Sequence, residues 1–164
     1  GKFFDPDNDA WFMQGEQDGD RYHFVSFKGN LATVNMGGDT AVLEGAWPLV
    51  GKGDQKKAWR PGGYQPLAVH PGTNRLYVAM PSGGVEGSHK NPANEIWVFD
   101  TQSKKRVARL PGNSATALEP SSDGKRLFAI DPMKASVVVW DRISPKAKVR
   151  LTQVGEFPGQ LEAE

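Results

Sequence analysis

The sequence predicts an all-β protein built from β-propeller blades of four antiparallel strands. Nineteen glycines and twelve prolines separate short runs rich in Val, Leu, Phe, Tyr and Trp. No window keeps a helical apolar period for long, so these runs indicate short strands joined by turns. The runs also recur in groups of four, with matching positions roughly 40 to 50 residues apart, which is the spacing of propeller blades.

Two groups of four predicted strands form the clearest repeat. The first group covers residues 67–70, 75–80, 95–100 and 106–110, and the second covers residues 115–119, 126–130, 136–141 and 148–154. The sequence between the strands repeats as well, because His70-Pro71 matches Glu119-Pro120. We therefore interpret each group as one blade.

A looser third copy precedes these two groups. Its predicted strands cover residues 11–14, 21–27, 30–36 and 41–44, and a tight turn at Lys28-Gly29 joins the middle two. The chain is then divided into approximate blades at 1–60, 61–112 and 113–164, about three blades of a propeller.

Three blades cannot close a ring. A single four-stranded blade cannot bury both of its faces, and propellers protect their blades by stacking about four to eight of them in a circle. We therefore expect the chain to belong to a longer protein, or to have its exposed faces covered by another copy or chain. A small β-sandwich is the alternative, since about eight to twelve strands can also pair into two sheets.

Composition and charge exclude several classes of function. The net charge is +1 with both signs scattered, so no basic patch indicates binding to nucleic acid or an anionic membrane. The absence of cysteine excludes disulfide scaffolds, thiolate zinc sites and a cysteine nucleophile. No apolar stretch approaches the roughly 20 residues of a membrane-spanning helix. Residues 1–5 lack the pattern of a secretion signal, so any export signal is expected to be cleaved or upstream.

One acidic segment imitates a calcium loop. Asp5, Asp7, Asp9 and Glu16 have the spacing of EF-hand oxygen ligands, but Ala10 stands where the turn needs glycine. No flanking helix is predicted either, so we interpret the segment as a solvated acidic turn. The glycines at 51–53 and 83–84 lack the rest of a phosphate-binding motif and are predicted to lie in ordinary loops.

No residue is predicted to be catalytic, to bind a cofactor or to bind a metal on this chain. His23, His70 and His89 are far apart and are expected in turns or at the surface. His89 lies in a long polar loop at 83–91, a position that commonly carries binding. The serines at 114, 121, 122, 136 and 144 show no nucleophile elbow, and 121–124 is predicted to form a hairpin turn. Residues 52–60 are the one stretch expected to form a turn of helix.

Several irregular stretches carry a resemblance to a known family. They are GEQDGD at 15–20, WRPGGY at 59–64, EGSHK at 86–90, EIWVFD at 95–100 and KRVARLPG at 105–112. On these stretches the chain resembles the carboxy-terminal part of the heavy chain of tryptophan tryptophylquinone-dependent amine dehydrogenases, the methylamine and aromatic amine enzymes. The resemblance spans nearly the whole chain.

The resemblance implies a longer, seven-bladed propeller in the periplasm, within a hetero-oligomer of two heavy and two light chains. It implies that the quinone is built from two tryptophans of a small cysteine-rich light chain. The enzyme would oxidise primary amines to aldehyde and ammonia and pass electrons to a small copper protein. A chain without cysteine fits the heavy role. The alternative is a non-catalytic propeller module for protein interaction, whereas a hydrolase or metalloenzyme lacks residues at useful spacing.

Overall fold

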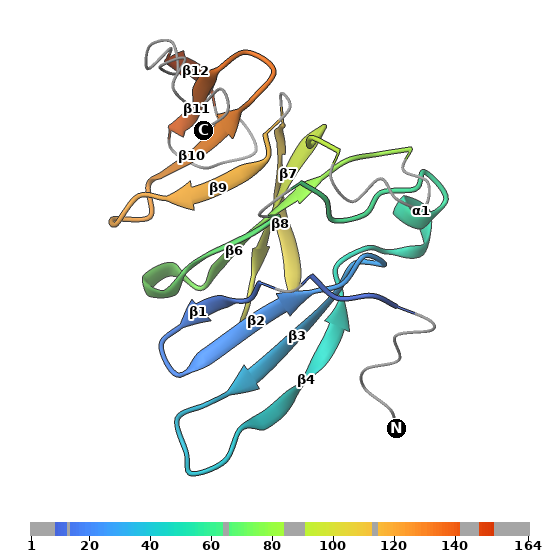
Figure 1. Cartoon of the computed structure of the whole chain (residues 1–164), viewed down its shortest axis with the longest axis vertical. Coiled ribbons are helices and arrows are strands. Elements are labelled where there is room, and N and C mark those ends of the chain that lie inside the picture. The colour runs from blue at the N-terminus through green and yellow to red at the C-terminus, as the bar shows by residue number, and fades with distance from the viewer. Residues whose placement is uncertain are drawn as a thin grey trace, which may run out of the picture.

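Three four-stranded antiparallel sheets make up the described part of the chain (Figure 1). The computed structural model describes residues 9–12, 14–63, 66–83, 91–112, 115–141 and 148–152. In every sheet the strands pair in the order in which they follow one another along the chain. This arrangement of antiparallel four-stranded sheets confirms the predicted fold class.

The first sheet differs from the sequence prediction at its first strand. Its strands are β1 (Glu16–Asp18), β2 (Arg21–Val25), β3 (Asn30–Asn35) and β4 (Val42–Pro48). The predicted strand at 11–14 is wrong, because its described residues lie outside the named strands and Trp11 forms an isolated bridge with Ser26. Phe12 instead packs edge-on against Phe27, 4.5 Å between ring centroids. The aromatic residues Trp11 and Phe12 lie at the end of β2, while the polar segment Glu16–Asp18 pairs with β2 as strand β1.

The second and third sheets follow the predicted strands closely. The second contains β5 (Leu67–His70), β6 (Arg75–Met80), β7 (Glu95–Asp100) and β8 (Lys105–Pro111). The third contains β9 (Ala117–Pro120), β10 (Arg126–Asp131), β11 (Ser136–Asp141) and β12 (Lys148–Thr152). A short 3-10 turn, η1 (Pro71–Thr73), joins β5 to β6. The predicted helical turn is α1 (Lys52–Gln55), between the first two sheets.

A polar register pair marks the same place in each sheet. The second strand begins with an arginine that lies opposite the last residue of the third strand. These pairs are Arg21 with Asn35, Arg75 with Asp100, and Arg126 with Asp141. In the second and third sheets the two side chains form ion pairs of 2.5 and 3.1 Å. The sequence repeat therefore has a structural counterpart in three dimensions.

The outer strands of the first two sheets share an irregularity. The pairing of β3 with β4 shifts register between Thr33 and Val34, which leaves Glu44 as the extra residue. The pairing of β7 with β8 shifts between Val98 and Phe99, which leaves Val107 as the extra residue. Counted from the end of the third strand, the two bulges occupy the same position.

The middle sheet is buried on both faces because its strands alternate between two cores. Leu76, Val78 and Met80 of β6 belong to a cluster shared with the first sheet. Tyr77 and Ala79, between them, belong to a cluster shared with the third sheet. The first strands also lie side by side, β1 next to β5 and β5 next to β9. Three stacked layers in one direction exclude the two-sheet sandwich alternative.

Gly112→Ala tests the close backbone approach at Gly112, where the chain leaves the second sheet and continues to the third. A Cβ at Gly112 would lie 2.6 Å from the backbone carbonyl carbon of Asn94 and from the nitrogen of Glu95. We expect the substitution to lower the free energy of unfolding by about 1–3 kcal/mol, measured by urea denaturation. Gly53→Ala is the control, since its Cβ meets no atom within 4 Å and Gly53 lies in α1. Equal effects of the two substitutions would contradict the packing argument.

Candidate functional site

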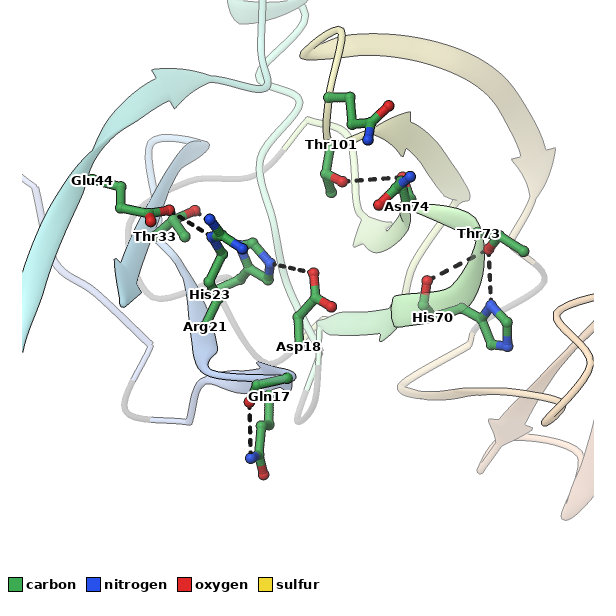
Figure 2. Close-up of polar contacts among 12 residues, drawn as sticks. Gln17, Asp18, Arg21, His23, Thr33, Glu44, His70, Thr73, Asn74 and Thr101 are labelled. Atoms are coloured by element: carbon green, nitrogen blue, oxygen red, sulfur yellow. Dashed lines mark hydrogen bonds and ion pairs between the residues drawn. The ribbon is translucent and has the colours of Figure 1, made fainter. Parts of the chain in front are cut away.

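A polar groove of about 320 Å³ lies between the first and second sheets (Figure 2). One wall comes from β1 to β4, and the other from the turns that begin at η1 and after β7. The lining residues are Asp18, Arg21, His23, Leu31, Thr33, Glu44, Gly45, Trp47, Asn74, Thr101, Gln102 and Lys104. The groove thus forms where the strands of the first sheet meet the turns of the second.

His23 connects three strands at the base of this groove. Its Nδ1 lies 2.9 Å from Thr33 Oγ1 on β3, and its Nε2 lies 3.1 Å from Asp18 Oδ2 on β1. Only 4% of His23 is exposed. Antiparallel pairing places Thr33 directly opposite His23, and the turn at Gly19, with a φ of +60°, brings β1 alongside β2. His23 therefore acts as a cross-strand clamp.

The expected surface position of His23 is wrong. Arg21, His23 and Val25 alternate along β2 and share one face of the sheet, on which Arg21 is exposed while His23 and Val25 are buried. Asp18 is also a carboxylate partner that sequence spacing did not reveal. The alternation within the predicted strand at 21–27 was the signal that could have located this side chain.

Glu44 binds two donors on the same wall. Arg21 Nε donates to its Oε2 at 2.7 Å, and Asn35 Nδ2 donates to its Oε1 at 3.0 Å. These hydrogen bonds, from Arg21 first and Asn35 second, lower the pKa of Glu44. The same contact raises the pKa of Arg21. Both carboxylate oxygens are therefore used to fix the bulge in β4.

The opposite wall is a turn fixed by Asp100. Asp100 Oδ1 accepts hydrogen bonds from the backbone nitrogens of Gln102 and Ser103 at 3.0 and 2.8 Å. The Ser103 bond is the main reason that the pKa of Asp100 is lowered. Lys104 ends this turn with a φ of +56°. The side chains of this turn face the groove. On the opposite wall, Asp18, His23 and Thr33 are already hydrogen-bonded to one another.

The groove contains one histidine, His23, and both of its ring nitrogens have partners within the first sheet. Among the residues that the structure describes, no group of three or more His, Asp or Glu residues could hold a metal ion. The site lines the junction between two sheets.

His70 is the last residue of β5, directly before the η1 turn, and it links the second and third sheets. Its Nδ1 lies 2.8 Å from Thr73 Oγ1, and its Nε2 lies 2.9 Å from the carbonyl oxygen of Ser122.

The predicted hairpin turn at 121–124 is confirmed, with Gly124 at a φ of +71°. Ser121 Oγ donates to Asp123 Oδ1 across it at 2.6 Å.

The acidic residues with calcium-loop spacing have different positions in the structure. Asp9 Oδ1 accepts from the backbone of Lys28, and its Oδ2 accepts from Asn30 Nδ2, at 3.1 and 2.9 Å. Asp9 thus fixes the turn between β2 and β3, while Glu16 lies in β1. Asp5, Asp7, His89, Ser114 and Ser144, with most of the polar loop at 83–91, lie outside the described residues.

A second cluster, which the sequence analysis missed, covers the outer part of the second sheet. The guanidinium of Arg106 lies 4.4 Å from the Trp97 ring centre, and that of Arg109 lies 5.1 Å from the Trp59 ring centre. Glu95 accepts from Arg109 twice, at 2.5 and 2.8 Å, and Asp54 of α1 accepts from Arg106 at 3.1 Å. This arginine–tryptophan stack holds the helical segment against β8.

Two carboxylates on the inner strands interact electrostatically. Burial raises the pKa of Glu16 on β1, and the negative charge of Glu119 on β9 raises it further. β5 lies between these two strands. The inner edge of the three sheets therefore carries an acidic pair.

The family model of the methylamine dehydrogenase heavy chain matches residues 1–162. The chain belongs to the methylamine dehydrogenase heavy chain family. This result agrees with the resemblance found in the sequence.

Two relatives are methylamine dehydrogenase heavy chains. The protein of Methylophilus methylotrophus is 30% identical over 112 residues, which are 66% of this chain and 27% of the relative. The protein of Methylorubrum extorquens is 22% identical over 140 residues, which are 84% of this chain and 34% of the relative. The chain therefore spans about a third of the length of the relatives it matches.

Solved structures support the fold independently of the family. The carboxy-terminal WD40 domain of Sif2 matches with a TM-score of 0.57 at 6% identity, covering 89% of this chain and 38% of that one. The β-propeller domain of Myceliophteria thermophila Cps50 (Swd1) matches with a TM-score of 0.53 at 9% identity, covering 80% of this chain and 40% of that one. At these identities the similarity concerns the propeller fold alone. Within the described residues, no helix is long and apolar enough to span a membrane.

Replacing His23 by leucine tests the cross-strand clamp. Leucine has a side chain of similar size but cannot form either hydrogen bond, so Asp18 and Thr33 lose this partner. We expect the free energy of unfolding to fall by about 1–3 kcal/mol in urea denaturation. Gln17→Ala, at an exposed residue of β1, is the control and should change it little. An unchanged stability of His23→Leu would show that the clamp does not hold the strands.

Glu16→Gln tests the acidic pair through the dependence of stability on pH. Because the folded-state pKa of Glu16 is raised, its ionisation weakens the fold as pH rises through that pKa. Below the usual glutamate pKa of 4.5 the variant and the parent should be equally stable. Above the raised pKa, the variant should have the higher urea midpoint. A higher midpoint for the parent at neutral pH would contradict the assignment.

Proposed function

We propose that this chain forms part of the heavy subunit of an amine dehydrogenase and serves as scaffold for a separate catalytic chain. The family match over residues 1–162 is the observation that carries the proposal. The heavy chain of such an enzyme implies at least one further kind of chain. We propose that each sheet is one blade, with boundaries near residues 60 and 112, in a longer propeller.

The chemistry of the proposed enzyme lies outside this chain. The light chain would carry the tryptophan tryptophylquinone, which oxidises a primary amine to an aldehyde and ammonia in the periplasm. This chain has no cysteine, which fits the heavy role and does not fit a cysteine-rich light chain. Electrons would then pass to a small copper protein, within an assembly of two heavy and two light chains.

The described side chains support a scaffold role. The buried His23 has its ring nitrogens bonded within the first sheet, and Glu44 has both oxygens bonded there. Polar groups with all their hydrogen bonds made inside a sheet hold strands in place and leave little capacity for proton transfer. The exposed turn at Gln102 and Lys104 offers a contact surface at the groove.

Purification of the complete protein from its native host tests the proposal. An affinity tag on the chain should recover a small cysteine-rich partner together with the absorption band of a quinone. The band should remain with the partner after the two chains are separated. A full-length protein that purifies alone and colourless would contradict the proposal and favour the protein-interaction module.

A further inference from the structure

Three buried oxygen-bearing side chains lie at one end of the third sheet. Asp131 and Ser136 are register partners on β10 and β11, with exposed fractions of 0% and 8%. Thr116, which is 6% exposed, precedes β9 and donates its backbone N–H to Ile130 at 3.0 Å. Ile130 is the residue before Asp131, and it pairs with Ala117, so Thr116 lies just beyond the regular pairing of β9 with β10. We call these three residues the oxygen row.

The oxygen row faces the second sheet. Leu127 and Ala129 alternate with the exposed positions of β10 and belong to the core shared with that sheet. Asp131 comes two residues later and points to the same side. Ala93 and Ala115 lie nearby, joined to one another by a backbone hydrogen bond of 3.0 Å. Small side chains therefore surround buried polar atoms at this end of the interface.

Two atoms of the oxygen row have no hydrogen-bond partner. Asp131 Oδ1 accepts from the backbone nitrogens of Met133 and Lys134 at 3.0 and 3.2 Å. Asp131 Oδ2 and Ser136 Oγ are both buried without a partner. A buried polar atom that loses its water and gains nothing in return is costly, and a carboxylate oxygen is the costlier case. Each of these two atoms therefore needs a hydrogen-bond partner.

The matching positions of the other sheets are already satisfied. Counted from the repeated arginine, Met80 takes the place of Asp131 in the second sheet, and it is fully buried and apolar. Glu95 takes the place of Ser136 there and binds Arg109. In the first sheet, Ser26 Oγ accepts from the backbone of Asn30 at 2.9 Å. The need for a further group is thus specific to the third sheet among these three.

We propose that the oxygen row holds one buried water molecule. The water donates one hydrogen to Asp131 Oδ2 and the other to Thr116 Oγ1, and it accepts the hydrogen of Ser136 Oγ. Thr116 is free to serve as acceptor because its own hydroxyl hydrogen is directed at the carbonyl of Ile130, at 3.5 Å. The three bonds equal the number that a buried water usually makes. A cation would leave the Ser136 hydrogen without an acceptor, so water fits the donors and acceptors better.

Ser136→Ala in the complete protein that contains this chain distinguishes an occupied site from an empty one. With a water bound, the substitution removes one of its hydrogen bonds, and the unfolding equilibrium constant should rise about fivefold. Ser122→Ala, at an exposed serine of the same sheet, is the control and should leave it nearly unchanged. If the hydroxyl is truly without a partner, Ser136→Ala stabilises the protein, and that result would overturn the proposal.

A crystal structure of the same protein provides the direct observation. We expect a density peak about 2.7–3.0 Å from Asp131 Oδ2, Ser136 Oγ and Thr116 Oγ1, which is the range of hydrogen bonds to water. The peak should weaken or move in Ser136→Ala. Contacts near 2.4 Å, with a stability that depends on whether sodium or potassium is present, would replace the water by a cation. A protein atom or an empty position there would equally refute it.

Discussion

The need to bury both faces of the middle sheet governs the rest of the described structure. Alternate residues of β6 and β7 enter two different cores, so these two strands of the second sheet are buried on both faces. Trp97 faces the first sheet and Val98 faces the third, and both are almost fully buried. A sheet of this kind is stable only between two others, which is why propeller blades stack. The polar groups are consequently confined to turns, edges and the junctions between sheets.

Those junctions are held by interactions of different kinds. His23 joins three strands of one sheet at the groove, whereas His70 joins two sheets through the carbonyl of Ser122. The segment between the first two sheets is held by the arginine–tryptophan stack, in which Trp97 is completely buried. Membership of the methylamine dehydrogenase heavy chain family is consistent with such a scaffold. Rigid turns on a stacked core present fixed surfaces to other chains.

The sequence predicted the strands better than the contacts between them. Short apolar runs that recur along the chain located β6, β7, β10 and β11, because these strands contribute many buried residues to the cores. The strand β1 was missed because it is short and polar, while Trp11 and Phe12 beside it have stronger β propensity. The partnership of His23 with Asp18 depends on strand register and a glycine turn, which composition does not determine. The oxygen row likewise follows from register, not from local spacing.

The paired bulges in the outer strands bear on how the protein behaves at high concentration. Exposed outer strands present unpaired backbone groups, and a flat row of these groups recruits strands from other molecules. The extra residues Glu44 and Val107 break that row at the same step in two sheets and increase the local twist. Neither edge can then accept a long incoming strand in regular register. The first two sheets thereby resist edge-to-edge aggregation, and new neighbours must dock through side chains and turns.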